Sequence, residues 1–590
     1  MTKPRTPTAR LGRGLVAYRK GHFLLNLLGW ATMWVMPVIP ALITREFFDR
    51  ITGDDPTGFT VATLVAIMVA YGLGRISLMV VAMWNDIHLT FRISSLLRRN
   101  MLEEIFDLPG AQSMKESPGE AISRFRDDVD EIQETFTWTL DMLGLSAFTI
   151  VALFILTGID AQFTAYVFAP MGGVVWIAAA TRRRVKRYRE AAREATGRIT
   201  ESLGETFGSV QSIKVAGAEQ PMIRHFRHLN DERRTVMVRD RVLTSALESL
   251  FWNTISIGTG IILIVTASAM SSGEFTIGEF AVFVYFIGFV TDAMFFLGLF
   301  IARYQQAAVS FGRMIELMGD GDPLRLVEPR QLHMSGPLAE PEVIPPHFAP
   351  LQQLDVTRLT FRYPESEAGI EDVSFGVPKG SFTVITGRIG AGKTTLLRAI
   401  LGLVKPDSGT VSWNGEVVPD PASFFIPPRS AYTSQVPRLF SLTLLQNLLM
   451  GRRDPEEQVR EAIDSAVMSS DVEGMAEGLA TMVGPMGVRL SGGQIQRSAT
   501  ARMFVRRPDL LVFDDVSSAL DVETERVLWE QLFRDRAGVT SIVVSHRRPA
   551  LQRADQIVVM DGGRVAAVGT LDELMDGSPE FMAMWEGNGE

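Results

Sequence analysis

The sequence predicts an all-α membrane domain of six spanning helices with long helical extensions, followed by an α/β domain with a mainly parallel sheet. Three observations predict this fold: six long apolar segments in the first half, a proline-rich stretch after them, and β-rich runs that alternate with helical patterns to the end. The 590 residues are 46% hydrophobic and 21% charged, with a mean hydropathy of +0.15. This balance excludes disorder and indicates one membrane-inserted part and one soluble part.

Two further properties of the composition exclude whole classes of function. There is no cysteine, which rules out a disulfide framework, a thiolate metal site and catalysis by a cysteine nucleophile. The formal net charge of −9 gives no general sign of a nucleic-acid-binding surface, so we expect no nucleic-acid partner.

The six apolar segments define the first predicted domain, residues 1–318, which we expect to be embedded in a lipid bilayer. Each segment is near or above the ~20 residues that a helix needs to cross a bilayer. Two long polar stretches, 89–138 and 182–244, separate the second segment from the third and the fourth from the fifth. The six predicted spans lie at about 23–44, 60–86, 139–158, 161–181, 245–270 and 277–301.

The distribution of Lys and Arg predicts the orientation of these spans. The first 22 residues carry six, stretch 89–138 carries six and stretch 182–244 carries fifteen, whereas the connections on the opposite side carry Arg45 and Arg50. We therefore expect a multi-pass protein of the cell membrane, with both termini and both long stretches in the cytoplasm.

The two long polar stretches are predicted to form helices that project into the cytoplasm. In 182–244, apolar residues recur at helical spacing, which favours an out-and-back helical hairpin over a flexible charged loop. Each arm of ~25 residues would be ~37 Å long.

The composition changes after residue 318. Residues 319–350 contain seven prolines and are expected to form an extended linker. Residues 351–590 are predicted to form the α/β domain, because β-rich runs at 381–386, 510–514 and 541–545 alternate with helical patterns.

A glycine-rich loop in the α/β domain carries a specific chemical signal. Residues 387–394 read Gly-Arg-Ile-Gly-Ala-Gly-Lys-Thr between a predicted strand and a predicted helix, which is the context of a phosphate-binding loop. Its backbone N–H groups and the helix N-terminus favour a β-phosphate. Lys393 is expected to reach the β- and γ-phosphate oxygens, and Thr394 to bind Mg²⁺. The predicted nucleotide-binding residues of this loop are Gly387, Arg388, Gly390, Ala391, Gly392, Lys393, Thr394 and Thr395.

A second signal is an apolar run, 510–513, that ends in the two carboxylates Asp514 and Asp515. Asp514 suits a role in Mg²⁺ binding, either directly or through water. Acidic residues at strand ends are common, so the two carboxylates indicate a nucleotide site only in combination with the phosphate-binding loop.

The pentapeptide Leu490-Ser491-Gly492-Gly493-Gln494 opens a predicted helix between the phosphate-binding loop and the two carboxylates. With these motifs the chain resembles the exporter-type half-transporters of the ABC family over nearly its whole length. The resemblance implies an ABC ATPase domain with ATP and Mg²⁺ as cofactors. It also implies that ATP lies between the phosphate-binding loop of one chain and the pentapeptide of a second, so that one chain makes no complete site.

The resemblance implies roles for further residues. Tyr363 matches the aromatic residue that stacks on adenine, and Gln435 matches the glutamine that touches Mg²⁺ and the attacking water. His546 matches the switch histidine that contacts the γ-phosphate, and residues 518–521 match the D-loop at the interface between the two chains.

One position departs from the family pattern. The residue after Asp514 is normally the glutamate that polarises water, and here it is Asp515. A side chain shorter by one methylene sets the carboxylate roughly 1 Å back, and a displacement of that size can cost about a hundredfold in rate. We therefore expect slow hydrolysis at this chain's own site, with Asp515, His546 and Gln435 as catalytic residues.

An intact pentapeptide beside an altered catalytic position resembles one half of the heterodimeric exporters, in which one ATP site is poor and the other competent. The predicted function is thus a subunit of an ATP-driven exporter that works by alternating access, with a second, different half-transporter chain as its partner. Two alternatives remain: a homodimer with two slow ATP sites, and an ATP-gated channel or regulator.

Features outside the nucleotide motifs bear on coupling. The turns near 116–121 and 208–214 are candidates for short helices that contact the nucleotide-binding domains, with an ordinary turn as the alternative. Met482 stands where exporters usually carry a glutamate, which reflects either asymmetric coupling or tolerated variation.

Charged and aromatic residues inside the spans are the remaining candidates. Arg75 and Asp292 are both predicted ~22 Å below the outer face, so an ion pair that locks two helices is favoured over a contact with substrate. The many aromatic residues of span 277–301 favour an apolar or amphipathic substrate, or else serve packing alone.

Overall fold

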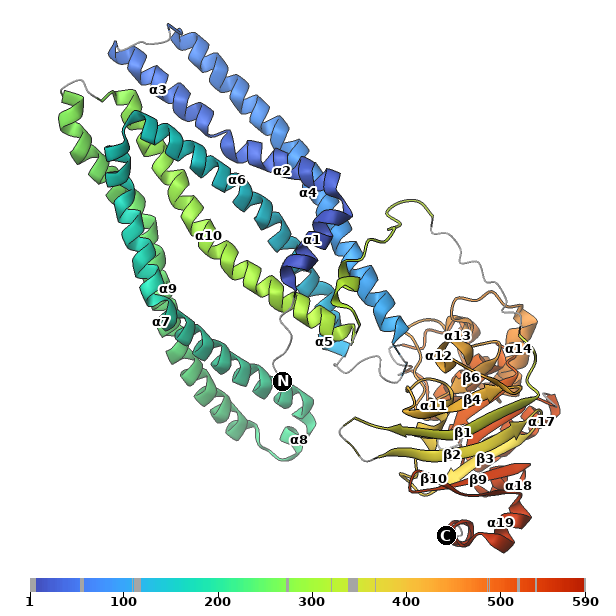
Figure 1. The fold of residues 1–590 in the computed structure, drawn as a ribbon. Helices are drawn as coiled ribbons and strands as arrows, with labels where there is room; N and C mark the ends of the chain where they lie inside the picture. The colour runs from blue at the N-terminus through green and yellow to red at the C-terminus, as the bar shows by residue number, and fades with distance from the viewer. Residues whose placement is uncertain are drawn as a thin grey trace. The chain divides into compact units, whose positions relative to one another are not determined.

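The computed structural model describes residues 7–53, 58–108, 110, 118–271, 275–319, 321–337, 348–364, 366, 368–484, 487, 489–516, 520–535 and 538–587. The chain divides into two compact units, residues 1–102 with 117–335 and residues 103–116 with 336–590. The described part of the first unit is helical, and the second contains two β-sheets with helices around them (Figure 1).

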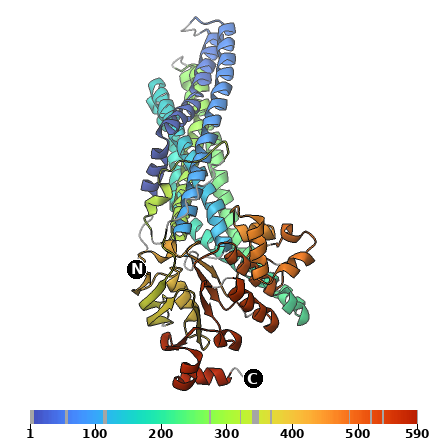
Figure 2. The ribbon, with the colours of Figure 1, turned by 90° about the vertical axis from the view of Figure 1, so that its right-hand side faces the viewer.

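The first unit is a set of long helices that run roughly parallel to one another in two perpendicular views (Figures 1 and 2). The helices are α1 (Thr8–Tyr18), α2 (Lys20–Val35), α3 (Val38–Thr52), α4 (Val61–Asp107), α5 (Pro118–Ser123), the π-helix η1 (Arg124–Asp128), α6 (Val129–Ile159), α7 (Ala161–Gly208), α8 (Val210–Val215), α9 (Glu219–Ser271), α10 (Ile277–Leu317) and the 3-10 helix η2 (Pro323–Val327).

Short polar side chains set the starts of two long helices. Asp160 accepts hydrogen bonds from the backbone N–H groups of Gln162 and Phe163 at 2.7 and 2.9 Å, and so begins α7 directly after α6. Thr276 and Glu279 form a reciprocal capping box at the start of α10. These caps satisfy N–H groups that the first turn of a helix leaves free, and they fix where the chain reverses.

Four helical segments in the described part of the chain are long and apolar enough to cross a membrane: Lys20–Thr52, Val61–Asp107, Gly119–Ile159 and Ile277–Leu317. They contain four of the six predicted spans. The other two, 161–181 and 245–270, lie within α7 and α9, where several side chains are not described, and they stay predictions.

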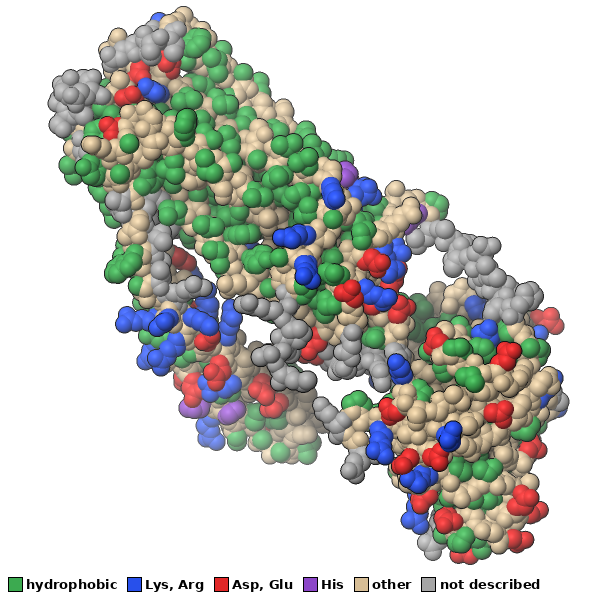
Figure 3. All heavy atoms as spheres, in the orientation of Figure 1, with side chains coloured by type: hydrophobic (Ala, Val, Ile, Leu, Met, Phe, Trp, Pro, Cys, Tyr) green, Lys and Arg blue, Asp and Glu red, His purple; other side chains and the backbone are tan. Residues whose placement is uncertain are grey.

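Hydrophobic side chains cover much of the visible surface of the first unit (Figure 3). On α4, Leu73, Val80 and Trp84 are 64%, 62% and 70% exposed. A contiguous apolar surface of this kind is unfavourable in water and favourable against lipid tails, so it marks the face that meets the bilayer.

The helical hairpin predicted over 182–244 is present. Helices α7 and α9 pack along each other, and α8 joins them at the end of the hairpin (Figure 1). Arg198 of α7 and Glu232 of α9 form an ion pair at 3.1 Å between the two arms. The helix α8 coincides with the candidate turn at 208–214, and α5 begins within the other candidate turn, 116–121, of which 116–117 lie outside the described residues.

The ion pair expected between Arg75 and Asp292 is not formed. Nη1 of Arg75 donates instead to the hydroxyl of Tyr71, one turn earlier on α4, at 3.2 Å. Within the described residues no ion pair joins Arg75 to Asp292. Equal depth on two helices does not fix the rotation of each helix about its axis, and that rotation decides which side chains face each other.

Part of the predicted linker is packed rather than extended. Pro323–Val327 forms a short 3-10 helix whose Leu326 and Val327 are buried in the apolar cluster that contains Leu11 of α1. The helical unit therefore extends to residue 335, beyond the boundary expected at residue 318.

The second unit contains a six-stranded and a four-stranded sheet. The six-stranded sheet has the order β10-β9-β3-β8-β7-β6, and all of its neighbouring pairs are parallel except β10 and β9. The four-stranded sheet, β2-β1-β4-β5, is antiparallel. The strands are β1 (Gln353–Arg362), β2 (Gly369–Pro378), β3 (Phe382–Gly387), β4 (Ser408–Trp413), β5 (Glu416–Val417), β6 (Ser430–Thr433), β7 (Leu510–Asp514), β8 (Thr540–Val544), β9 (Gln556–Asp561) and β10 (Arg564–Gly569).

Helices surround the six-stranded sheet. They are α11 (Lys393–Ile400), α12 (Pro421–Phe424), α13 (Leu444–Leu449), α14 (Glu456–Ser465), α15 (Ser469–Gly474), the 3-10 helix η3 (Gly478–Ala480), α16 (Gly492–Phe504), α17 (Val522–Asp535), α18 (Arg548–Gln552), α19 (Leu571–Gly577) and α20 (Pro579–Gly587). Strands β3, β7 and β8 are buried along their whole length, which is why the sequence shows them as continuous apolar runs.

Close packing of α2 on α6 generates a prediction for stability. A Cβ atom at Gly144 of α6 would lie 2.7 Å from Cδ1 of Trp34 and 3.2 Å from the carbonyl oxygen of Trp30, both on α2. We expect Gly144→Ala to lower the free energy of unfolding by about 1–3 kcal/mol, because the extra methyl overpacks this contact. Thermal unfolding of the purified protein in nanodiscs measures the change.

The matched control is Gly158→Ala on the same helix, where an added Cβ meets nothing within 4 Å. Alanine is the better helix former by about 1 kcal/mol, so this variant should keep or raise the stability. Equal unfolding temperatures for the two variants would contradict the close approach of α2 and α6.

Candidate nucleotide-binding site

Four loops meet at the carboxyl edge of the six-stranded sheet. Strand β3 leads into the phosphate-binding loop and β7 ends at Asp514, while β8 and β6 end two residues before His546 and Gln435. Because β3, β8, β7 and β6 are neighbours and parallel, these four ends lie side by side.

A cavity of about 500 Å³ lies at this edge and gathers most of the predicted site residues. Its lining contains Tyr363, Gly390, Ala391, Gly392, Lys393, Thr394, Thr395, Gln435, Asp514, Asp515 and His546, together with Ala368, Gly369, Ile389 and Val544, which the sequence analysis did not single out.

The phosphate-binding loop depends on glycine at two positions. Gly390 and Gly392 have φ angles of +86° and +92°, a region that side chains other than glycine rarely adopt. Gly392 also begins α11 and lies so close to Gly369 that a Cβ atom would be 3.0 Å from its carbonyl oxygen. The N-terminus of α11 therefore opens into the cavity, where its free N–H groups and dipole favour a phosphate.

Lys393 lies across the loop that carries it. Its Nζ donates to the carbonyl oxygens of Gly387 and Arg388 at 2.7 and 2.9 Å. Gly387 and Arg388 thus contribute through backbone oxygens behind the cavity and are not part of its lining. Burial lowers the pKa of Lys393, and the nearby carboxylates Asp514 and Asp515 oppose that shift.

Asp514 is held by hydroxyl groups on both of its oxygens. Oγ1 of Thr394 donates to Oδ1 at 2.9 Å, and the hydroxyl of Tyr432 donates to Oδ2 at 3.3 Å. Burial raises the pKa of Asp514, and these two hydrogen bonds counter the shift. A hydroxyl oxygen and a carboxylate oxygen at this separation match the hard oxygen ligands that Mg²⁺ prefers, so Thr394 and Asp514 fit a Mg²⁺ bound to nucleotide phosphates.

Asp515 combines an unusual backbone with a half-buried side chain. Its φ angle is +51°, and its backbone N–H donates to the carbonyl oxygen of Val544 at 3.1 Å. Nε2 of Gln435 donates to Oδ2 of Asp515 at 3.2 Å. Burial raises the pKa of Asp515, whereas the charges of His546, Arg547 and Lys393 and the hydrogen bond from Gln435 lower it. The left-handed backbone suits aspartate, whose short polar side chain is enriched there, better than the longer glutamate.

Tyr363 is distant in sequence from Asp514 and Asp515 but lines the same cavity, and Arg398 lies near it. The Tyr363 hydroxyl and Oγ1 of Thr395 are 3.4 Å apart. Burial lowers the pKa of Arg398, but electrostatic interactions with Tyr363 and Tyr432 outweigh this effect and raise the pKa. Arg398 therefore lies near both Tyr363 and Tyr432, and Tyr432 contacts Asp514.

The sequence analysis missed Tyr432 and Arg398. Tyr432 belongs to β6, and only the parallel pairing of β6 with β7 brings its hydroxyl to Asp514. Its aromatic side chain three residues before Gln435 is a weak signal that the sequence alone does not distinguish from packing.

Ser491, Gly492, Gly493 and Gln494 lie outside the cavity of their own chain. They begin α16 with a capping box, in which Oγ of Ser491 accepts from the N–H of Gln494 at 3.3 Å and Oε1 of Gln494 accepts from the N–H of Ser491 at 2.9 Å. Gln494 also donates to Asp471 at 2.9 Å. Of the D-loop, only Leu520 and Asp521 are described.

Two family models match the chain. Residues 22–294 match the family model described as the ABC transporter transmembrane region. Residues 370–518 match the family model described as ABC transporter, and they contain the phosphate-binding loop. Together these two regions make up more than half of the sequence. The chain belongs to the ABC transporter family. One membrane region followed by one ATPase domain is the architecture of an exporter half-transporter, so this ABC transporter carries ATP-driven transport machinery in a lipid bilayer and functions as a dimer of such chains.

Curated relatives match this ABC transporter over most of their length. An ATP-dependent lipid A-core flippase of Bordetella avium is 27% identical over 484 residues, covering 81% of this chain and 79% of the flippase. A probable multidrug resistance ABC transporter of Bacillus subtilis is 26% identical over 505 residues, covering 84% and 83%. A solved bacterial Atm1-family ABC exporter with ATP bound has the same fold, with a TM-score of 0.74 at 21% identity over 98% of this chain and 99% of that one.

The hydroxyl of Tyr432 generates a prediction for the metal requirement. Tyr432→Phe removes one hydrogen bond from Asp514 and leaves the ring in place, so we expect Mg²⁺ to bind about tenfold more weakly in the presence of ATP. A Mg²⁺ titration of ATP hydrolysis by the transporter in nanodiscs measures the change.

Tyr304→Phe is the control, because Tyr304 is a half-exposed residue of α10 outside the nucleotide cavity. This variant should titrate like the unmodified chain. An unchanged Mg²⁺ requirement in Tyr432→Phe would show that Tyr432 does not hold Asp514 in the loaded site.

Proposed function

We propose that this chain is one subunit of an ATP-driven exporter that moves an apolar or amphipathic substrate out of the cytoplasm, and that its own ATP site hydrolyses slowly. The observation that carries the second part is the place of Asp515. Its short carboxylate lines the same cavity as Lys393 and His546, at the position where the family has glutamate.

The lining of the cavity supplies the parts of an ATP site. Tyr363 stacks on the adenine, the N–H groups from Gly390 to Thr395 surround the phosphates, and Lys393 neutralises the β- and γ-phosphate charge. Mg²⁺, held by Thr394, Asp514 and Gln435, supplies further neutralisation of the phosphates when it is bound.

Three side chains take part in the hydrolytic step. Gln435 orients the attacking water, Asp515 accepts its proton, and His546 donates a hydrogen bond to the γ-phosphate. A carboxylate about 1 Å too far from the water loses the near-attack geometry on which the rate depends.

The pentapeptide supports a two-chain site. Ser491, Gly492 and Gly493 are ordered by the cap of α16 and lie outside the cavity of their own chain, so the N–H groups of Gly492 and Gly493 are available to ATP held by a second chain. We propose that the second chain is a different half-transporter that carries the catalytic glutamate. A homodimer with two slow sites is the alternative, and the curated relatives leave both open.

The proposed substrate class rests on the relatives rather than on α10. Two of them are named a lipid A-core flippase and a probable multidrug resistance transporter, and both names imply apolar or amphipathic substrates. In α10, Phe283 and Phe286 are buried, and Phe286 packs on Phe148 with ring centroids 5.7 Å apart. Much of the aromatic content of 277–301 therefore serves packing.

Lengthening the side chain at position 515 tests the slow site. We expect Asp515→Glu to raise the single-turnover rate of ATP hydrolysis by about tenfold, less than the about hundredfold that 1 Å can cost, because the left-handed backbone resists glutamate. Radiolabelled ATP and the purified chain in nanodiscs give this rate.

Asp515→Asn is the matched control, because it keeps the size of the side chain and removes its basic oxygen; its rate should fall below that of the unmodified chain. A fast unmodified chain whose rate does not respond to Asp515→Glu would overturn the slow site. Brisk turnover without any partner would exclude the heterodimer, and substrate accumulation against a gradient in sealed vesicles distinguishes an exporter from a channel.

A further inference from the structure

A buried ion pair lies directly behind the segment that carries His546. Nη1 of Arg547 contacts Oε2 of Glu525 at 2.6 Å, and the Glu525 side chain is 1% exposed. The indole N–H of Trp529 donates to the other oxygen of Glu525 at 3.3 Å. Both carboxylate oxygens of this α17 residue are therefore engaged, as a buried carboxylate requires.

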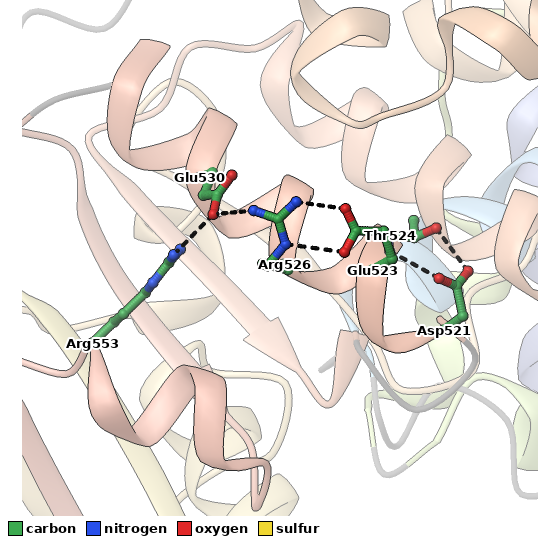
Figure 4. Close-up of polar contacts among 6 residues, drawn as sticks. All are labelled: Asp521, Glu523, Thr524, Arg526, Glu530 and Arg553. Atoms are coloured by element: carbon green, nitrogen blue, oxygen red, sulfur yellow. Dashed lines mark hydrogen bonds and ion pairs between the residues drawn. The ribbon is translucent and has the colours of Figure 1, made fainter.

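The same guanidinium reaches the D-loop. Nη1 of Arg547 also donates to the carbonyl oxygen of Leu520 at 3.2 Å. The next residue, Asp521, caps α17 by accepting from the N–H and the hydroxyl of Thr524 at 2.9 and 2.7 Å (Figure 4). One side chain thus joins the end of the D-loop, the first turn of α17 and the residue after His546.

The backbone on the other side of His546 is also fixed. The N–H of Ser545 donates to the carbonyl oxygen of Ile385 in β3 at 3.2 Å, and Oγ of Ser545 accepts from the N–H of Arg547 at 3.2 Å. His546 therefore lies between one anchor to the sheet and one anchor to α17. A shift of Arg547 displaces the imidazole relative to the phosphate-binding loop.

We propose that Arg547 is a positioning residue for ATP hydrolysis, which holds His546 in register with the D-loop through the buried carboxylate of Glu525. The inference rests on the proposed role of His546 at the γ-phosphate and adds to it. The Arg547 side chain is not part of the nucleotide cavity lining, and its charge lowers the pKa of Asp515, which is part of that lining. We therefore expect its loss to change the hydrolysis rate and to leave ATP affinity nearly unchanged.

A second, exposed ion-pair chain on α17 provides the comparison. Arg526 pairs with Glu523 and Glu530 on the same helix, and Arg553 after α18 contacts Glu530 at 3.3 Å (Figure 4). It connects the same two helical segments as Arg547 and Glu525, but through side chains that solvent screens. Breaking it should leave His546 in place.

The test compares single-turnover ATP hydrolysis and ATP affinity in the full chain in nanodiscs. We expect Arg547→Met and Glu525→Gln each to lower the rate at least tenfold, with the dissociation constant for ATP within twofold of that of the unmodified chain. The double variant should be no slower than the slower single variant, because both changes remove one link. Arg547→Lys, which keeps the cation opposite Glu525, should recover most of the rate, and Arg553→Met should stay within twofold.

The link would be overturned if the fold-loss of rate in the double variant equalled the product of the two single fold-losses. It would also be overturned if the rate of Arg547→Met stayed within twofold of that of the unmodified chain. If Arg547→Met does not fold, Glu525→Gln, which keeps the shape of the side chain, decides the question by the same criteria. His546→Ala separates the two proposals: no loss of rate in that variant refutes the proposed role of His546, whereas a loss there without one in Glu525→Gln refutes the positioning role alone.

Discussion

Parallel pairing of four neighbouring strands is the constraint on which the nucleotide site depends. Each of β3, β8, β7 and β6 is short, and each is followed within two residues by a group that faces the cavity. Antiparallel pairing anywhere in this set would send one of those groups to the opposite edge of the sheet. The complete burial of β3, β7 and β8 makes this arrangement costly to change, because moving such a strand to an edge of the sheet would expose apolar side chains.

The parts of the site that could be predicted are those that a short stretch of sequence encodes. The phosphate-binding loop, the pentapeptide and the pair Asp514-Asp515 each consist of consecutive residues, and the structure places Lys393, Asp514, Gln435 and His546 in one cavity. The contacts that could not be predicted join side chains from different strands or helices. Tyr432 reaches Asp514 only through the register of β6 on β7, and Arg547 reaches Glu525 across more than twenty residues of sequence.

The same limit explains the errors in the helical unit. Apolar periodicity predicted the long helices and the hairpin of α7 and α9, because it reports on each helix by itself. It carried no information on how α4 and α10 are rotated, and the expected pair of Arg75 and Asp292 does not form. Proline content likewise predicted an extended linker, whereas two apolar residues within it, Leu326 and Val327, bury themselves against α1.

The left-handed backbone at Asp515 has a consequence for how such a site evolves. A single codon change can lengthen the carboxylate, but the main chain that this aspartate has come to occupy penalises the longer side chain. On the proposed role of Asp515, the gain in rate from a glutamate at this position is therefore limited until a neighbouring substitution relaxes the turn.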